Sequence, residues 1–371
     1  MNILFLNSTK EKAWGGIEKW MLITAIGLRE KGYNIFCGGK PNAIFTNRCK
    51  ESGFITFSMK FGIDFSIINS FRLSRIFKEY QIDIVINHYN KEIKMASIAR
   101  KILRRPIIIV ARAGMPNVHN NWRYRFLYRR MVNGVITNAV AIKEKYMSYG
   151  WIEEQFVRLI RNGVNVNVPT TIDREAIENR YNLPKRRPVL GIFGRLVSIK
   201  QHNLFLDVAN NILREYPDAI FLIVGSGPLE EDIRQYTIDL GIEKNVFMLG
   251  FQSDLNPLYA FCDLVLLTSS YDGFPNVLME AMAVGRPVIT FDVGGVRELI
   301  QSERTGAIVP PNDVQTMTDK TLELIKSEEI REDIGREART SMIENFSIAK
   351  MVDGVEDYLK ELYAKNPAIW N

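Results

Sequence analysis

Residues 264–291 read LVLLTSSYDGFPNVLMEAMAVGRPVITF, and this stretch decides the fold. The apolar run Leu264–Leu267 predicts a buried strand, and Pro287–Phe291 predicts the next strand. A polar loop with Gly273 and Pro275 lies between them, followed by the helical stretch Val277–Val284. A strand, a helix and a second strand in this order favour a βαβ unit, in which the two strands run parallel.

Both halves of the chain repeat this alternation. Further strands are expected at 3–6, 34–37, 82–87, 106–111 and 134–137, and then at 189–193, 219–224, 246–249 and 307–309. The pattern predicts an α/β protein made of two Rossmann-like, doubly wound domains. Because such sheets bind ligands at the carboxyl ends of their strands, we expect the two domains to face a cleft.

The domain boundary is expected near residue 168. Residues 1–167 would form the N-terminal domain and residues 168–348 the C-terminal domain. The stretch 168–187 holds Pro169, Pro184 and the basic cluster Lys185–Arg187, a composition that predicts an interdomain linker.

Composition excludes several classes of protein. The 371 residues are 46% hydrophobic and 24% charged, which excludes wholesale disorder. No apolar run reaches the roughly 18 residues of a membrane-spanning helix. The first residues lack a basic stretch and predict a strand, not a signal peptide. The three cysteines form no CxxC pair, which favours a reducing cytosol over a disulfide framework.

Charge is divided unevenly along the chain. Residues 1–168 carry 27 Lys and Arg against 11 Asp and Glu, a net charge of +16, whereas residues 169–371 carry −10. A basic half favours an anionic partner, which could be a membrane surface, a phosphorylated acceptor or a nucleic acid. No recognised nucleic-acid module accompanies the basic residues, so nucleic-acid binding is the weaker alternative.

The loop and helix after Leu267 carry two carboxylates, Asp272 and Glu280. The first turn of the helix exposes backbone N–H groups that suit an anion. A carboxylate facing a cleft suits a vicinal diol such as a ribose. The alternative is that Asp272 only caps the helix and that Glu280 is solvated.

Two cations follow the strand 189–193. Arg195 offers a planar fork for phosphate oxygens, and Lys200 offers a point charge. Their place in an acidic half indicates a local anion, although two ordinary surface cations would look the same in sequence. Cations of this kind could neutralise a diphosphate leaving group without a metal.

Glycine-bearing loops follow two other strands. The turn Gly225–Pro228 has the G-x-G pattern but lacks the third glycine of a dinucleotide fingerprint, so a nicotinamide dehydrogenase loses support. Gly15 and Gly16 would let the backbone approach a ligand closely, or would form a simple turn. No P-loop, HExxH, GxSxG or zinc-spaced Cys/His cluster occurs in the sequence.

Taken together, these motifs resemble glycosyltransferase family 4, whose fold is called GT-B. The resemblance spans essentially the whole chain and is sharpest from Leu190 to Pro311. Asp272 and Glu280 match the family's E-x7-E motif, with Asp in place of the first Glu. The other matches are the G-R-x-x-x-x-K of 194–200, the G-x-G-P of 225–228, Gly15-Gly16, the 162–165 stretch NGVN for N-G-V-D, and the closing Phe346-Ser347. The resemblance further implies a last helix, at about 349–371, that crosses back to the N-terminal domain.

The resemblance implies a role for each matched residue. Arg195 and Lys200 would hold the donor diphosphate, and Glu280 would hold the ribose hydroxyls. Asp272 would meet the donor sugar together with the adjoining loop and helix start, which comprise Gly273, Phe274, Pro275, Asn276 and Val277. Phe251 would lie near the base, and Gly16 would let the N-terminal loop approach the diphosphate and acceptor. No cofactor is implied beyond the donor, a nucleotide-diphosphate sugar carried by UDP or GDP.

The sequence departs from the family pattern in the N-terminal domain. The family often has a histidine after the strand that ends here at Ala111, and this chain has Arg112. Arg112 would then meet the sugar, the diphosphate or an anionic acceptor as a catalytic-site residue. His119 lies seven residues further on and is the alternative occupant of that place, although a surface histidine is also consistent.

A stretch of the N-terminal half that is both basic and aromatic is WRYRFLYRR, residues 122–130. Arg123, Arg125, Arg129 and Arg130 alternate with aromatic residues, a pattern that suits an interfacial helix against anionic lipid headgroups. The alternative is a solvated basic face with the aromatics in the core. The favoured hypothesis places the protein in the cytoplasm, with peripheral association at the inner face of the membrane.

The function favoured by the sequence is a retaining, metal-independent hexosyltransferase of cell-surface polysaccharide or glycolipid synthesis, with a glycan or lipid-linked acceptor. Two alternatives stay open. One is a GT-B epimerase or hydrolase of sugar nucleotides, which would turn over without acceptor. The other is a membrane-binding protein with a vestigial donor site.

Overall fold

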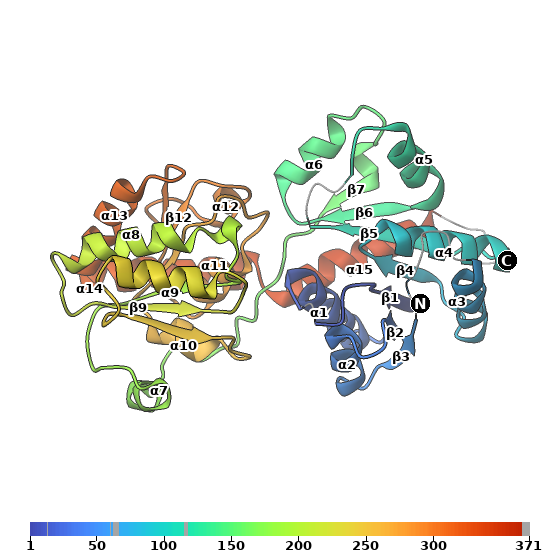
Figure 1. The fold of residues 1–371 in the computed structure, drawn as a ribbon. Helices are drawn as coiled ribbons and strands as arrows, with labels where there is room; N and C mark the ends of the chain where they lie inside the picture. Colours follow the sequence, from blue (N-terminus) through green and yellow to red (C-terminus); the bar gives the residue numbers. More distant parts are fainter. Residues whose placement is uncertain (13, 60, 62–66, 115–117, 366–371) are drawn as a thin grey trace. The chain divides into compact units, whose positions relative to one another are not determined.

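Two units, each built on one parallel sheet, make up the chain in this computed structural model (Figure 1). Unit 1 consists of Met1–Gly163 and the segment from Ile348 onward, and unit 2 consists of Val164–Ser347. The structure describes all residues except 13, 60, 62–66, 115–117 and 366–371. The end of the helix expected at 349–371 therefore lies outside the described residues.

Unit 1 holds a seven-stranded sheet of order β3-β2-β1-β4-β5-β6-β7, with all pairs parallel. Its strands are β1 (Asn2–Leu6), β2 (Asn34–Gly39), β3 (Ile55–Ser58), β4 (Ile84–Asn87), β5 (Ile108–Ala113), β6 (Gly134–Thr137) and β7 (Val157–Leu159). Its helices are α1 (Gly16–Glu30), α2 (Ile44–Glu51), α3 (Ile67–Glu79), α4 (Asn90–Leu103), α5 (Trp122–Met131), α6 (Val140–Met147), the 3-10 turn η1 (Glu154–Phe156) and α15 (Ile348–Ala364). Successive residues of β1 belong to different apolar clusters, because side chains of a strand alternate between the two faces of the sheet.

Unit 2 holds a six-stranded parallel sheet of order β10-β9-β8-β11-β12-β13. Its strands are β8 (Val189–Phe193), β9 (Ile220–Val224), β10 (Val246–Gly250), β11 (Leu264–Leu267), β12 (Val288–Phe291) and β13 (Ala307–Val309). Its helices are α7 (Arg174–Tyr181), the 3-10 turn η2 (Ser198–Lys200), α8 (His202–Leu213), α9 (Glu230–Asp239), α10 (Asn256–Phe261), α11 (Asn276–Ala283), α12 (Val296–Leu299), α13 (Val314–Lys326) and α14 (Glu328–Asn345). All residues of β8, β9, β11 and β12 are buried, as in a parallel sheet that is covered on both faces.

The prediction of two doubly wound α/β domains is confirmed, and three local features differ from expectation. The strands β3 and β7 were not expected, because β3 has no buried residue and β7 is only three residues long. The stretch expected to be a linker contains α7. Asp173 caps this helix, Ile177 is buried, and Arg174 donates to the carbonyl of Phe261 at 2.9 Å. This part of the chain therefore packs on unit 2.

The last described helix, α15, packs on α1 within unit 1. Its buried residues recur at helical spacing and join the apolar cluster on one face of the unit 1 sheet: Met351, Val352, Val355, Tyr358, Leu359 and Leu362. The Tyr358 hydroxyl donates to the carbonyl of Phe156 at 2.9 Å, and Lys31, just after α1, pairs with Asp353 and Glu356 at 2.7 Å each. The C-terminal helix is therefore part of the core of unit 1.

We expect Leu359→Ala to lower the free energy of unfolding by about 2–5 kcal/mol, because the fully buried side chain leaves a cavity. The matched control on the same helix is Asp357→Ala, at an exposed position, with a change of at most about 0.5 kcal/mol. Urea unfolding followed by circular dichroism measures both values. Equal effects of the two substitutions would contradict the packing of α15 on unit 1.

Candidate functional site

The strand order of unit 2 reverses between β8 and β11, which lie side by side. In doubly wound sheets such a switch point opens a crevice at the carboxyl ends of the two strands. The loop after β8 carries Arg195 and Lys200, and the loop after β11 carries Asp272. The fold therefore brings the strongest sequence motifs to one edge of one sheet.

Lys200 and Asp272 form an ion pair across this edge. The Lys200 Nζ lies 2.8 Å from Asp272 Oδ2, and the two side chains are 17% and 20% exposed. The Thr268 hydroxyl bridges the loops by donating to the carbonyl oxygens of Lys200 and Gln201, at 3.0 Å each. The Ser270 N–H donates to the carbonyl of Ile199 at 2.9 Å. The two loops are thus held together by backbone contacts as well as by charge.

A third loop, after β12, fixes the backbone of Asp272. Gly294 has a φ of +56°, and a Cβ on this residue would collide with the Asp272 carbonyl oxygen. The N–H of Gly295 donates to the same oxygen at 3.2 Å. The sequence analysis missed this glycine pair, and its only signal was two adjacent glycines after a strand.

The turn Gly225–Pro228 has a similar packing role. A Cβ on Gly225 would collide with the Gly194 carbonyl, and a Cβ on Gly227 with the Leu196 carbonyl. The Leu196 N–H donates to the Ser226 carbonyl at 3.1 Å. These glycines let the β9 loop lie against the β8 loop that carries Arg195 and Lys200.

Glu280 lies on α11 and is held by a buried tyrosine. The hydroxyl of Tyr259, on α10, donates to Glu280 Oε2 at 2.9 Å. Tyr259 is fully buried, with its ring centroid 4.1 Å from that of Phe193 at the end of β8. Burial and the neighbouring Glu280 carboxylate raise the pKa of this hydroxyl, so it stays a donor. Sequence spacing gave no sign of this contact.

The remaining residues assigned to the donor differ in exposure. Arg195 is exposed, and its side chain makes no hydrogen bond or ion pair with a described residue. Phe251, just after β10, is 64% exposed. Phe274 is buried, with its ring 5.8 Å from that of Phe346. Gly273 adjoins Asp272, Pro275 is the N-cap of α11, and Asn276 and Val277 are its first two residues.

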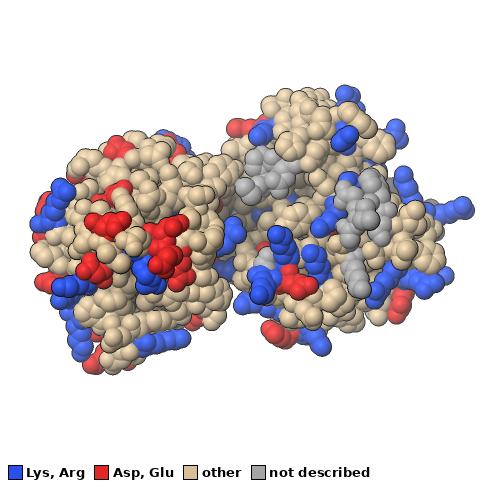
Figure 2. All heavy atoms as spheres, in the orientation of Figure 1, with Lys and Arg blue, Asp and Glu red and all other residues tan. Residues whose placement is uncertain are grey.

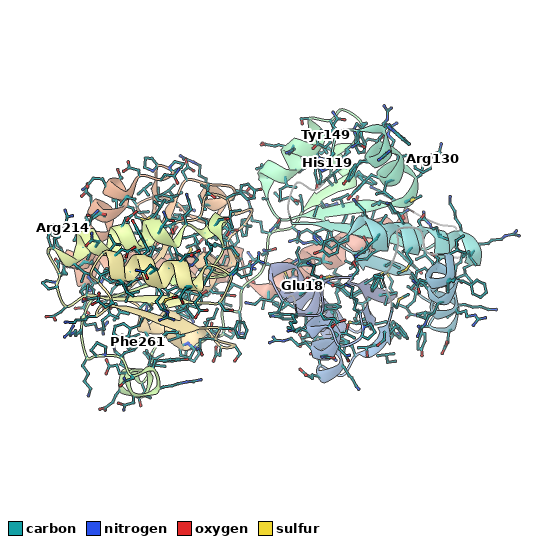
Figure 3. The ribbon with its side chains drawn as sticks, viewed as in Figure 1. Glu18, His119, Arg130, Tyr149, Arg214 and Phe261 are labelled. Atoms are coloured by element: carbon teal, nitrogen blue, oxygen red, sulfur yellow. The ribbon has the colours of Figure 1, made fainter. Side chains whose placement is uncertain are left out.

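In unit 1 the strand order reverses between β1 and β4. Gly16 is exposed and begins α1, which follows β1. Glu18, labelled in Figure 3, closes this loop, because its carboxylate accepts from the Gly15 N–H at 2.9 Å and from the Thr9 hydroxyl at 2.6 Å. The helix start is thereby fixed next to the switch point of this sheet.

Arg112 lies on β5 and is buried, with 3% of its surface exposed. Its Nη2 donates to Asn162 at 2.9 Å, and its guanidinium lies 4.8 Å from the centre of the Trp20 ring. Its Nε and Nη1 have no partner, and no described carboxylate forms an ion pair with it. Burial lowers its pKa to about 10, so it stays charged at neutral pH. The alternative residue, His119, labelled in Figure 3, is exposed. Its ring lies edge-on to that of Tyr124, with 5.2 Å between the ring centroids.

Glu92 of α4 is a buried carboxylate that the sequence analysis missed. It accepts from the N–H groups of Ser8, His88 and Tyr89, and so joins the carboxyl ends of β1 and β4. Burial raises its pKa to about 7. A Tyr-x-x-Glu spacing at the start of α4 was the only available signal.

The arginines of the basic and aromatic stretch 122–130 lie on α5 and are exposed: Arg123, Arg125, Arg129 and Arg130. Trp122 and Phe126 of the same helix are 74% and 55% exposed, whereas Leu127, Tyr128 and Met131 are buried. Figure 2 shows several separate groups of Lys and Arg atoms on the visible face of unit 1, and groups of both Asp and Glu and Lys and Arg atoms on that of unit 2. The helix therefore presents aromatic and cationic side chains together.

Neither a metal-binding cluster nor a membrane-spanning helix is found among the described residues. Nowhere among them do three or more His, Cys, Asp or Glu side chains gather as a metal site would require. No described helix is both long enough and apolar enough to cross a membrane.

Solved structures with this architecture are GT-B glycosyltransferases, and the class is defined by two Rossmann-like units of this kind. The HepE protein of Anabaena in complex with UDP aligns over 97% of this chain and 100% of its own, with 22% identity and a TM-score of 0.84. The TarM protein of Staphylococcus aureus, in complex with UDP and other ligands, aligns over 96% and 99%, with 14% identity and a TM-score of 0.75.

Two family models match the sequence. Residues 14–168 match the model described as Glycosyltransferase Family 4, and residues 173–341 match the model described as Glycosyl transferases group 1. The two matches cover most of the chain, which therefore belongs to glycosyltransferase family 4, as its motifs predicted.

The curated relatives include a protein named as a synthase and one named as a galactosyltransferase. N-acetyl-alpha-D-glucosaminyl L-malate synthase of Bacillus anthracis is 32% identical over 54% of this chain and 52% of its own length. The match thus spans about half of that relative. UDP-Gal:alpha-D-GlcNAc-diphosphoundecaprenol alpha-1,3-galactosyltransferase of Escherichia coli is 23% identical over 83% of this chain and 87% of its own.

We expect Gly294→Ala to destabilise unit 2 by at least about 2 kcal/mol more than Gly241→Ala. Both glycines have a positive φ, +56° and +68°, but a Cβ on Gly241 meets nothing within 4 Å. The control therefore carries the backbone strain of alanine without the collision with Asp272. Equal losses in urea unfolding would show that the Asp272 backbone does not depend on this contact.

Proposed function

We propose that the protein is a retaining, metal-independent glycosyltransferase. It would move a hexosyl-type sugar from a nucleotide-diphosphate sugar to an acceptor in cell-surface polysaccharide or glycolipid synthesis. In this proposal unit 2, which corresponds to the C-terminal domain expected at residues 168–348, binds the donor. Unit 1 binds the acceptor. The observation that carries the proposal is the Lys200–Asp272 pair at the switch point of unit 2.

The donor diphosphate would replace Asp272 as the ion-pair partner of Lys200. A diphosphate carries more charge than one carboxylate and accepts several charge-assisted hydrogen bonds. Arg195 is exposed and faces no described partner, so it can turn toward the same phosphates. Asp272, once released, would accept hydrogen bonds from hydroxyls of the donor sugar, beside the backbone of Gly273.

Glu280 would bind the ribose hydroxyls, and Phe251 would lie near the base. The Tyr259 hydroxyl occupies one oxygen of Glu280 and holds the carboxylate in a fixed place. The exposed Phe251 ring offers a flat apolar surface to a base.

Bond cleavage leaves negative charge on the nucleoside diphosphate. Two nearby cations, Arg195 and Lys200, would stabilise this developing charge without a metal. The leaving phosphate would then accept the proton of the attacking acceptor hydroxyl on the same face of the sugar, which retains the anomeric configuration.

The place of unit 1 in this proposal rests on Gly16 and Arg112. The exposed Gly16 lets a ligand approach the backbone at the start of α1. Arg112 keeps two donor nitrogens unpaired, and an anionic group of the ligand would satisfy them.

The names of the relatives support UDP as the donor nucleotide, because the Anabaena structure holds UDP and the Escherichia coli relative is named for UDP-Gal. They do not favour the epimerase or vestigial-site alternatives.

A thermal-shift screen of UDP, GDP, ADP and their sugars, with and without EDTA, tests which donor binds. A ligand at 100 times its Kd should stabilise the fold by about 2.7 kcal/mol. Turnover of donor without any acceptor would instead support the hydrolase or epimerase.

The exposed face of α5 supports a second proposal, that the protein associates with an anionic membrane surface from the cytoplasm. Arginines would meet lipid headgroups, and Trp122 and Phe126 would enter the interface. A lipid-linked acceptor would then be within reach of unit 1.

We expect Lys200→Met to weaken UDP binding at least about tenfold, because a charge-assisted hydrogen bond to phosphate is lost. Lys185→Met is the matched control, since Lys185 pairs with Glu175 on the surface of the same unit and both are 68% exposed. Its effect should stay within about twofold. Isothermal titration calorimetry measures both, and equal affinities of the two variants would refute the role of Lys200.

Asp272→Asn separates the sugar contact from the diphosphate contact. The competitor for Lys200 is neutralised, so the affinity for UDP should stay equal or rise. The affinity for the UDP-sugar should fall by about 5- to 100-fold relative to UDP, because the hydroxyls lose a charged acceptor. A parallel loss for both ligands would mean that Asp272 only supports the loop.

The double substitution Trp122→Ala/Phe126→Ala should lower the partitioning onto phosphatidylglycerol vesicles at least about tenfold, because about 1.4 kcal/mol of burial suffices for that. Ile330→Ala/Ile343→Ala is the control, since both isoleucines are exposed apolar residues of α14 in unit 2. Vesicle sedimentation at low salt gives both values. No pelleting of the unaltered protein would end the membrane proposal.

A further inference from the structure

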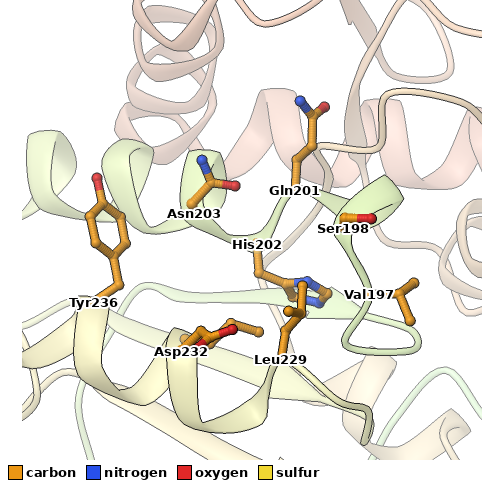
Figure 4. A pocket seen from close by; sticks show the side chains of 9 residues that line it. Val197, Ser198, Gln201, His202, Asn203, Leu229, Asp232 and Tyr236 are labelled. Carbon is orange, nitrogen blue, oxygen red and sulfur yellow. The ribbon is translucent and has the colours of Figure 1, made fainter.

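Unit 2 has a hollow between α8 and α9 that none of the assigned roles uses. Its volume is about 260 Å³, and η2 forms one end of it. Figure 4 shows the His202 imidazole beside Leu229, with Asp232 and Tyr236 on the facing helix and the Gln201 side chain pointing away. The lining residues are Val197, Ser198, Gln201, His202, Asn203, Leu229, Asp232, Ile233 and Tyr236.

His202 is a buried polar side chain without a partner. It is 3% exposed, and neither Nδ1 nor Nε2 makes a hydrogen bond. Burial, and then the charge of Lys200, lower its pKa to about 4, so the ring is neutral at neutral pH. A neutral imidazole has one N–H donor and one nitrogen acceptor, and buried groups of this kind are ordinarily satisfied. The structure leaves both unsatisfied at the wall of a hollow.

The lining indicates what kind of molecule would satisfy them. No Lys or Arg is among the lining residues, and Asp232 is an exposed carboxylate, so phosphates and carboxylates are disfavoured. The Tyr236 ring is fixed by its hydroxyl, which donates to Asp207 at 2.6 Å. Leu229 and Ile233 add an apolar surface. An aromatic ring, an apolar wall and a few donors and acceptors suit a neutral hydroxylated ring.

The size also fits such a ring. The hollow is larger than the roughly 30 Å³ that one water occupies in the liquid. It is slightly smaller than the 300–1,000 Å³ typical of sites for drug-sized ligands. One sugar residue is of intermediate size.

We propose that this hollow binds one neutral sugar residue, as found along a glycan chain, at a site separate from the donor nucleotide. One hydroxyl of the sugar would pair with a ring nitrogen of His202, a further hydroxyl would donate to Asp232, and the C–H face would lie on Tyr236. The site adjoins the donor loop, because His202 follows Lys200 by two residues. It does not depend on the proposed transfer reaction.

Labelling the histidines with ¹⁵N tests the proposal, because the chain has only three, His88, His119 and His202. Titration with methyl α-D-glucopyranoside should shift the ring nitrogens of His202 alone, with a Kd of about 1 mM, as expected for a dozen heavy atoms. The shift should persist at saturating UDP. Loss of the shift with UDP would mean that the sugar binds at the donor site. No shift at ~50 mM sugar would mean that only water meets the imidazole. Either result would overturn the proposal.

Two exposed residues on α9 provide matched variants. Asp232→Ala should weaken the sugar at least about fivefold, whereas Glu231→Ala, on the same turn but outside the lining, should stay within about twofold. Both positions are exposed, so the fold should be retained. Equal Kd values for the two variants, or a larger His202 shift with inorganic phosphate than with the sugar, would contradict a neutral-sugar site.

Discussion

The candidate site of unit 2 depends on how closely the backbones of four loops can approach one another. The carbonyl of Asp272 lies where a side chain on residue 294 would begin, and the carbonyl of Gly194 lies where one on residue 225 would begin. Only glycine leaves that space empty, and Gly194, Gly225 and Gly294 also have a positive φ. The loops after β8, β9, β11 and β12 are therefore fixed by backbone contact before any side chain is considered.

This backbone frame explains why Lys200 and Asp272 meet. The Thr268 hydroxyl and the Ser270 N–H hold the two loops in register, and the side chains then span the remaining gap at 2.8 Å. A partly exposed pair of this kind adds little to stability, because the Coulomb gain is offset by desolvation and lost side-chain freedom. Because both side chains are partly exposed, Lys200 and Asp272 can each exchange the other for a different partner. An arriving dianion can replace the carboxylate, whereas a buried and fully bonded pair would resist replacement.

The sequence predicted those parts of the candidate site that each form a short motif directly after one strand. The cations of 194–200 and the carboxylates of 272–280 each follow a recognisable strand, so the parallel-sheet rule alone places them at one edge. The contacts of Gly294, Thr268 and Tyr259 join loops far apart in sequence and have no local pattern. The unsatisfied nitrogens of His202 are a property of packing, and no spacing reveals them. The strands β3 and β7 were missed because short, partly polar edge strands lack the apolar run that marks buried ones.

The two sheets differ in how the polar atoms at the carboxyl ends of their strands are bonded. In unit 2 the assigned carboxylates are already bonded, Asp272 to Lys200 and Glu280 to Tyr259. In unit 1 the carboxyl ends of β4 and β5 carry buried polar atoms without partners, on Asn87 and on Arg112. Each such atom costs about 1–3 kcal/mol of stability relative to a bonded one, and more when it is charged. The Glu92 carboxylate satisfies three N–H donors at this edge, because it accepts a hydrogen bond from each of them. Arg112 holds two of the unbonded atoms, Nε and Nη1, and an anion meets these two donors better than a neutral hydroxyl does.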